Sequence, residues 1–138
     1  MSRPLVTVRS ISDSEVAVIE RALAVAATDE SAQDLIGLVR SLQVVGRCWC
    51  GCASVDFRVP AQGQVARIVA DAVANAPDGE HLGLIVWALD NHLSGLEIYS
   101  YSDRLASLPV VATISSYGSG GGADAARPLQ PNSPRGSA

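Results

Sequence analysis

Apolar residues near the N-terminus recur at helical spacing. Residues 12–15 (Ser-Asp-Ser-Glu) have the form of a capping box, in which the first and fourth residues satisfy each other's backbone N–H groups. After this box, one face of the segment carries Val16, Ile19 and Leu23. The pattern therefore predicts a helix over about 13–27.

A second amphipathic stripe follows a polar break at 28–31. Ser31 is placed to cap a second helix, whose apolar positions are Leu35, Leu38, Val39 and Leu42. Two helices joined by a short turn also have the form of a helix-turn-helix. The exposed face of this second helix offers Arg40 beside Asp34, which is a poor surface for DNA phosphates. We therefore expect the two helices to pack on a sheet.

From residue 44 onward the pattern becomes typical of β-strands. Residues 44–49 predict a strand that enters a Cys-Gly-Cys turn, and residues 55–59 alternate apolar and polar side chains. The clearest hairpin joins an apolar run at 82–89 to an alternating segment at 93–101. Because both faces of 84–89 are apolar, we expect that strand to be central and covered on both sides. Pro109 limits residues 108–114 to an edge strand or a loop.

Residues 65–76 fit two structures. Their apolar positions have helical spacing, which favours a helix on periodicity alone. Their β-branched content and the Pro-Asp-Gly turn that follows at 77–79 favour a strand.

These segments together predict an α+β fold: two N-terminal helices packed on one face of an antiparallel meander sheet of four to five strands. The domain is expected to span residues 1–114. Beyond it, Gly, Ser, Pro and Ala dominate, and large apolar residues are scarce. Such a segment buries too little surface to offset the entropy of ordering its backbone. Residues 115–138 are therefore predicted to be a disordered tail.

The charge and hydropathy of the chain disfavour several classes of partner. The net charge is −4, and the tail contributes +1 through one aspartate and two arginines, so the rest of the chain carries −5. This acidic domain has no run of basic residues for a nucleic-acid backbone. Nor does any apolar run approach the roughly 20 residues that span a bilayer. Asp13 and Glu15 interrupt any signal-peptide pattern, so a soluble, cytoplasmic protein is expected.

Four stretches resemble, as a set, a group of small uncharacterised bacterial α+β proteins from high-GC genomes. They are 45–52 (VGRCWCGC) with 55–57 (VDF), 77–79 (PDG), 83–88 (GLIVWA) and 93–99 (LSGLEIY). The exclusive use of Arg as the basic residue agrees with a GC-rich genome. The group has no established activity to transfer. The resemblance implies that 65–75 pairs with 82–89 across the Pro-Asp-Gly turn, which favours a strand there.

Cys48, Cys50 and Cys52 are the first candidates for chemistry. A straight strand would space alternate side chains about 7 Å apart, too far for one zinc ion, although Gly51 could supply a bend. A fourth ligand would have to come from elsewhere, with His81 and His92 as the available imidazoles. A disulfide within the cluster would be sterically awkward and would not persist in a reducing compartment. The simplest interpretation is that the three are small buried apolar residues or a spare thiol, and a metal site is the alternative.

The exposed face of the predicted sheet is the second candidate. If the strands share one outer face, it carries a patch made of Asp56, Arg58, Glu97, Tyr99 and Tyr101. Tyr and Arg are frequent at binding hot spots, so the patch could bind a partner, or it could be a solvated face with cross-strand ion pairs. Trp87 belongs either to the core or to this face, and its place in a central strand favours the core.

No segment has the pattern of an active site. Among the motifs sought, the chain has neither a phosphate-binding glycine loop after a strand nor a Gly-x-Ser-x-Gly elbow. We therefore predict a protein that is not an enzyme and uses no cofactor. Its expected role is that of a non-catalytic interaction module, similar in build to immunity or inhibitor proteins, which binds another protein or itself. The alternative is a metal- or redox-linked protein that uses the three cysteines.

Overall fold

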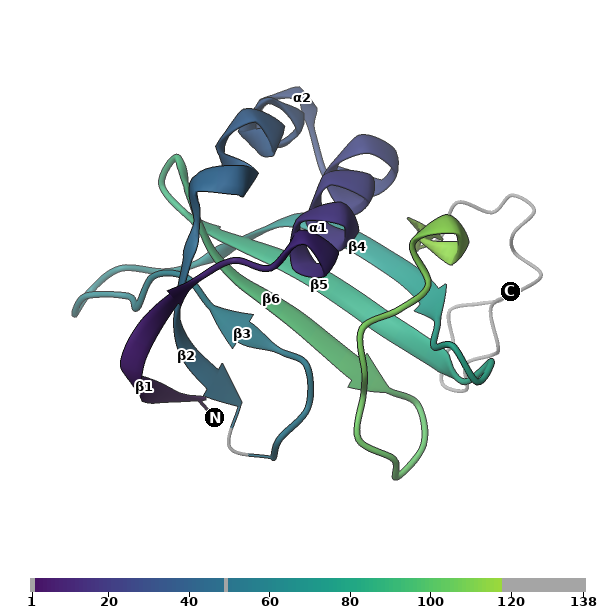
Figure 1. The fold of residues 1–138 in the computed structure, drawn as a ribbon. Coiled ribbons are helices and arrows are strands. Elements are labelled where there is room, and N and C mark those ends of the chain that lie inside the picture. Colours follow the sequence, from purple (N-terminus) through teal and green to yellow (C-terminus); the bar gives the residue numbers. More distant parts are fainter. Residues whose placement is uncertain (1, 49, 118–138) are drawn as a thin grey trace.

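The computed structural model describes residues 2–48 and 50–117, which form one sheet with helices on one side (Figure 1). The N-terminal half contains β1 (Ser2–Ser10), α1 (Asp13–Ala26), α2 (Glu30–Gln33), the 3₁₀ helix η1 (Asp34–Ser41), β2 (Gln43–Cys48) and β3 (Val55–Asp56). The C-terminal half contains β4 (Arg67–Asn75), β5 (His81–Leu89), β6 (His92–Ser100), the 3₁₀ helix η2 (Val111–Thr113) and β7 (Ser115–Ser116). The predicted α+β class is confirmed.

The sheet has seven strands in the order β1-β2-β3-β6-β5-β4-β7, and all neighbours are antiparallel. It is therefore larger than the expected four to five strands, and it is not a single meander. Two meanders, β1-β2-β3 and β4-β5-β6, are joined where β3 pairs with β6. No local pattern predicts that junction, because its strands lie far apart in sequence. β1 was not predicted, and β3 is shorter than the expected strand at 55–59.

Helix α1 begins and packs as its sequence pattern predicts. Its capping box is formed by Ser12 and Glu15, each of which accepts a hydrogen bond from the other's backbone N–H. Ile19 and Leu23 are fully buried beneath the helix. Helices α1, α2 and η1 all lie over the same face of the sheet, which agrees with the predicted layering (Figure 1).

The second helix differs from the prediction in its start and its geometry. Asp29, and not Ser31, caps it: the Asp29 carboxylate accepts hydrogen bonds from the Ala32 backbone N–H and the Ser31 hydroxyl. The positive end of the helix dipole also stabilises a carboxylate at this position. One α-helical turn is followed by the 3₁₀ helix η1, which contains Gly37, a residue that weakens an α-helix by about 1 kcal/mol.

The ambiguous segment at 65–76 is a strand. Residues of β4 pair with β5 along nearly its whole length, across a turn in which Gly79 has a φ of +92°. Val69 and Ala72 are two of the apolar residues whose spacing fits a helix. Both lie in strand β4 and are fully buried in the core. Pairing with β5 satisfies the backbone groups of β4, and this tertiary contact outweighs the local periodicity.

The packed chain extends beyond the predicted boundary at residue 114. Ser115 and Ser116 form β7 against Val73 and Ala72, and so they do not belong to a disordered tail. The remaining predicted tail, 118–138, lies outside the described residues. Within the described part of the chain, no helix is both long enough and apolar enough to cross a bilayer.

Candidate functional site

The central hairpin has one face that none of the helices within residues 2–48 and 50–117 covers. Leu84 and Val86 of β5 are fully buried beneath the helices, whereas Ile85 and Trp87 point to the opposite face and are half-buried. Trp87 is therefore on the exposed face, the alternative to the core position that its central strand favoured. β5 is central in the sheet, but the helices of the described residues lie over only one of its sides (Figure 1). We call the uncovered side of β4, β5 and β6 the open face.

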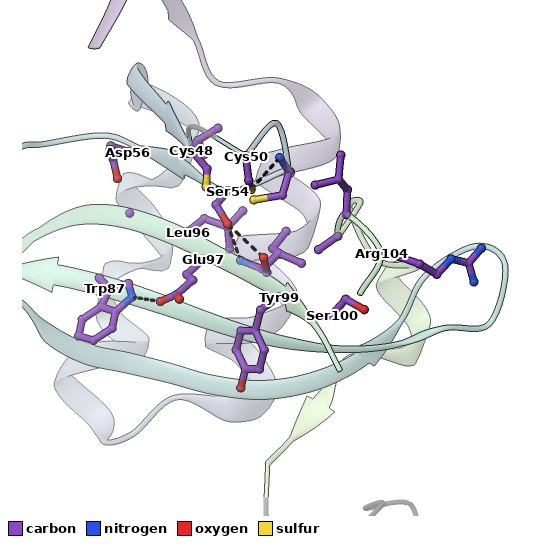
Figure 2. A pocket seen from close by; sticks show the side chains of 16 residues that line it. Cys48, Cys50, Ser54, Asp56, Trp87, Leu96, Glu97, Tyr99, Ser100 and Arg104 are labelled. Atoms are coloured by element: carbon purple, nitrogen blue, oxygen red, sulfur yellow. Dashed lines mark hydrogen bonds between the residues drawn. The ribbon is translucent and has the colours of Figure 1, made fainter. Parts of the chain in front are cut away.

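A pocket of about 480 Å³ lies on the open face and reaches the cysteine turn (Figure 2). The pocket brings together side chains from β2, β3, β5, β6 and the segment that follows β6. Its polar and aromatic lining includes Cys48, Cys50, Cys52, Ser54, Asp56, Trp87, Glu97, Tyr99 and Arg104. The sequence contained no signal for this pocket, because its lining depends on the pairing of β3 with β6.

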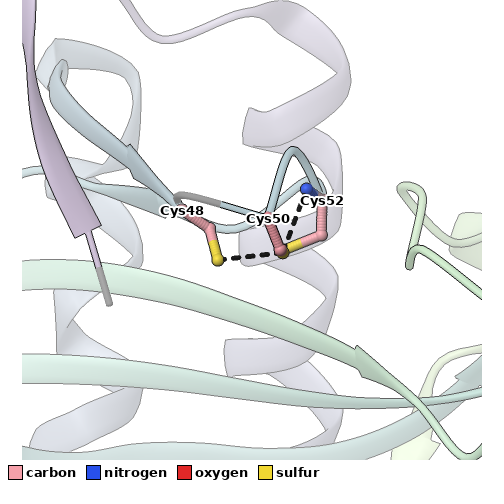
Figure 3. Close-up of side chains that lie close together, drawn as sticks. All are labelled: Cys48, Cys50 and Cys52. Atoms are coloured by element: carbon pink, nitrogen blue, oxygen red, sulfur yellow. Dashed lines mark hydrogen bonds between the residues drawn. The ribbon is translucent and has the colours of Figure 1, made fainter. Parts of the chain in front are cut away.

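The three cysteines, which all line the pocket, lie close together (Figure 3). Their Sγ atoms all lie within 4.8 Å of one another, and the Cys48 and Cys50 sulfurs are 3.0 Å apart. Gly51 makes this possible with a φ of +88°, a backbone conformation that residues with a Cβ rarely adopt. β2 ends at Cys48, so Cys50 and Cys52 lie on a bent turn instead of a straight strand. The sequence indicated that Gly51 could supply a bend, and the structure has that bend.

The three thiols differ in exposure and in acidity. Cys50 is exposed, Cys48 is half-buried and Cys52 is buried, and none of them is in a disulfide. Hydrogen bonding to the sulfurs of Cys48 and Cys52 raises the pKa of Cys50 to about 11. Burial by itself would raise the pKa of Cys52, but hydrogen bonds from Ser54 and from the other two thiols outweigh it and lower that pKa. Cys52 is therefore the thiol that ionises before Cys50.

Ser54 fixes the cysteine turn against β6. Its hydroxyl accepts a hydrogen bond from the Ile98 backbone N–H at 2.8 Å and donates to the Ile98 carbonyl at 3.2 Å. The next residue back, Ala53, donates its N–H to the Ala106 carbonyl at 3.0 Å. The turn is thereby held on two sides. Sequence analysis missed Ser54, since its partner lies 44 positions away.

Aromatic and acidic side chains form the floor of the pocket. The Trp87 indole N–H donates to the Glu97 carboxylate at 3.1 Å (Figure 2). The Tyr99 ring lies over Gly83, its cross-strand neighbour, in space that a Cβ at Gly83 would occupy. Burial, and then the nearby Tyr101 and Asp71, raise the pKa of Tyr99 above its ordinary value. Tyr99 therefore presents a neutral ring to the pocket at physiological pH.

The predicted surface patch is only partly assembled. Asp56, Glu97 and Tyr99 line the same pocket as the cysteines. Arg58 is exposed beyond the end of β3 and does not line it. Tyr101 follows β6, is 46% exposed, and contacts Tyr99 with the ring centroids 5.8 Å apart.

The basic residue at the pocket is Arg104, which sequence analysis did not single out. Its guanidinium is 2.9 Å from the Asp78 carboxylate and 3.4 Å from the Glu80 carboxylate. The two histidines considered as metal ligands lie elsewhere. His81 hydrogen-bonds to Asn75 at the β4–β5 turn, and His92 is exposed at the β5–β6 turn.

Comparisons of the chain with protein-family models, with curated proteins and with solved structures find no match.

Proposed function

We propose that the protein binds a thiophilic metal ion through Cys48, Cys50 and Cys52. The observation that carries the proposal is the convergence of three free thiols, with all Sγ atoms within 4.8 Å of one another. Two sulfurs bound to one tetrahedral zinc ion lie roughly 3.8 Å apart, since each Zn–S bond is about 2.3 Å. Small side-chain rotations would therefore bring the cluster to a ligating geometry.

The donor set defines the class of metal. Thiolates are soft ligands that select zinc or copper(I) over magnesium or calcium. The reduced thiols that this role requires agree with the cytoplasmic location predicted from the sequence. The sequence suggested a metal-linked or a redox-linked role for the cysteines. The three converging sulfurs favour the metal-linked role.

Zinc binding to the reduced protein tests the proposal. We expect one zinc ion per chain, measured by competition with a chromophoric chelator, and a higher melting temperature with zinc than with a chelator. Cys50→Ser should lower the affinity by about 100-fold or more, because one of three ligands is lost. Cys50 is exposed, so this variant should fold.

The matched control is His92→Ala, which removes a potential ligand outside the cluster and should leave zinc affinity unchanged. If the reduced wild-type protein retained no zinc, or if Cys50→Ser bound it as well as the wild type, the proposal would be wrong.

The open face supports a second candidate, the non-catalytic interaction module, which we propose in the immunity- or inhibitor-like form suggested by the sequence. Trp87 and Tyr99 are half-buried there, and Tyr101, 46% exposed, lies beside Tyr99. Asp56 and Glu97 give the same face a negative charge. A protein partner with a basic surface is therefore the occupant that fits. We also propose that the chain belongs to the group of small bacterial proteins that its motifs resemble.

Native mass spectrometry of the protein from its own host tests this second candidate. A stoichiometric partner should be retained by the wild type and by Arg21→Ala, which alters the helical side of the molecule. The partner should be lost when Tyr101 is replaced by Ala, because aromatic residues carry much of the energy of such interfaces. Equal retention in both variants would exclude the open face as the interface.

A further inference from the structure

We infer that the metal held by Cys48, Cys50 and Cys52 keeps a fourth coordination position that opens into the pocket, and that this position accepts a neutral nitrogen donor of the imidazole class in preference to an anion. This inference rests on the proposed metal site. The proposed metal site by itself identifies no ligand for the pocket, whereas the fourth position assigns one class of ligand to it.

The number of protein ligands leaves the fourth position open. Among the described residues, the group of potential metal ligands that contains the three cysteines includes no carboxylate and no imidazole. His81 and His92 lie at hairpin turns, and neither lines the pocket. Zinc and cobalt sites with three protein ligands complete a tetrahedron with a water or an external ligand.

The pocket provides the space for that external ligand. All three cysteines line it (Figure 2), and the Cys50 side chain is exposed to solvent. The volume of about 480 Å³ is within the range of small-molecule sites. A ligand bound to the metal can therefore extend over the floor formed by Trp87 and Tyr99.

The charges around the pocket disfavour an anion. Three thiolates with one divalent ion leave a net negative charge, to which the carboxylates of Asp56 and Glu97 add. Arg104 does not offset them, because its guanidinium already pairs with Asp78 and Glu80. A neutral donor avoids this repulsion.

The aromatic side chains favour a planar ligand. The Trp87 indole is oriented by its hydrogen bond to Glu97, and the Tyr99 ring is held over Gly83. Flat rings stack favourably on such side chains in other proteins. A planar ring that bears a neutral nitrogen, as in imidazole, therefore fits both the charge and the shape of the site.

Cobalt(II) is the probe for this position. The cobalt-loaded protein should show thiolate-to-cobalt charge transfer in the near ultraviolet and the visible bands of a tetrahedral site. Added imidazole should shift the visible bands until the fourth position is saturated. The thiolate-to-cobalt charge-transfer band should remain. Azide, which is an anion, should bind at least about tenfold more weakly than imidazole, because the surroundings of the site are negatively charged.

Two carboxylate-to-amide variants test the cause of the selectivity. Glu97→Gln removes a charge from the pocket at constant shape and should strengthen azide binding severalfold. Glu20→Gln is the matched control, since Glu20 pairs with Arg40 on the helical side and should not affect either ligand.

The outcomes separate the two proposals. Absence of thiolate-to-cobalt charge transfer would overturn the metal site itself. Charge transfer without any response to imidazole would show that the fourth position is filled, and would overturn this inference while the metal site stands. Azide binding as tight as that of imidazole, or unchanged by Glu97→Gln, would overturn the assigned class of ligand.

Discussion

Glu15 shows how one residue can serve two parts of the fold. Its carboxylate accepts the Ser12 backbone N–H at 2.9 Å and forms a two-pronged ion pair with Arg9 at 3.0 and 2.8 Å. The side chain is only 7% exposed, so these partners replace the water that it loses. Burial opposes the charge, but the hydrogen bonds from Arg9 and Ser12 outweigh it, and the net effect lowers the pKa of Glu15.

Replacing Glu15 by Gln should therefore destabilise the protein in a pH-dependent way. Gln keeps the capping box but loses the ion pair, which we expect to cost about 1–2 kcal/mol at pH 7. A lowered native pKa stabilises the fold above the unfolded value of 4.5, and this contribution is lost as the pH falls through the native value. Urea unfolding of both proteins across this range should show the difference disappearing in acid. A difference that persisted there would contradict the charge-based explanation, and Asp103→Asn in an exposed loop is the control.

At the scale of elements, the β5–β6 hairpin depends on a glycine opposite an aromatic ring. Gly83 pairs with Tyr99, and the Tyr99 ring occupies the space of the missing side chain. Such pairs shield the glycine backbone and fix the register of two strands. The same packing holds Tyr99 flat on the floor of the pocket.

Gly83→Ala should therefore cost about 1–3 kcal/mol of stability, because the ring must move. In a Tyr99→Ala background the same substitution should cost much less, which a double-mutant cycle of chemical denaturation can measure. Gly37→Ala is the matched control: no atom lies within 4 Å of its added Cβ, so this helical substitution should be neutral or slightly stabilising. Equal effects at Gly83 in both backgrounds would refute the role of the ring.

At the scale of the whole molecule, the last described segment closes the sheet and the core. Ile114 is 1% exposed, and Thr113 accepts the Asn75 backbone N–H at 2.9 Å. The Tyr117 backbone N–H donates to the Asp71 carbonyl at 3.0 Å. The end of the described chain therefore belongs to the packed domain.

Two truncations should differ sharply in thermal unfolding. A chain that ends at Tyr117 should keep the wild-type melting temperature, because the sequence beyond it offers little apolar surface to bury. A chain that ends at Pro109 loses Ile114 and β7, and should be destabilised by at least about 2 kcal/mol. Equal melting temperatures for the two truncations would show that this closing segment is dispensable.

The local pattern of the sequence by itself determined α1, with its capping box, and the β5–β6 hairpin. The capping box joins residues three positions apart, and the hairpin joins two strands that follow each other directly in the sequence. It also singled out the cysteines, Asp56, Glu97 and Tyr99 as candidates, but not their common pocket. The tertiary structure decided that β4 is a strand, that Trp87 faces outward, and that β3 lies beside β6. The first depends on pairing with β5 and the second on which side of the sheet the helices cover, while the third is accompanied by contacts such as Ser54 with Ile98, 44 positions apart. Pairing between distant strands sets which side chains share a face, and no periodicity along the chain encodes it.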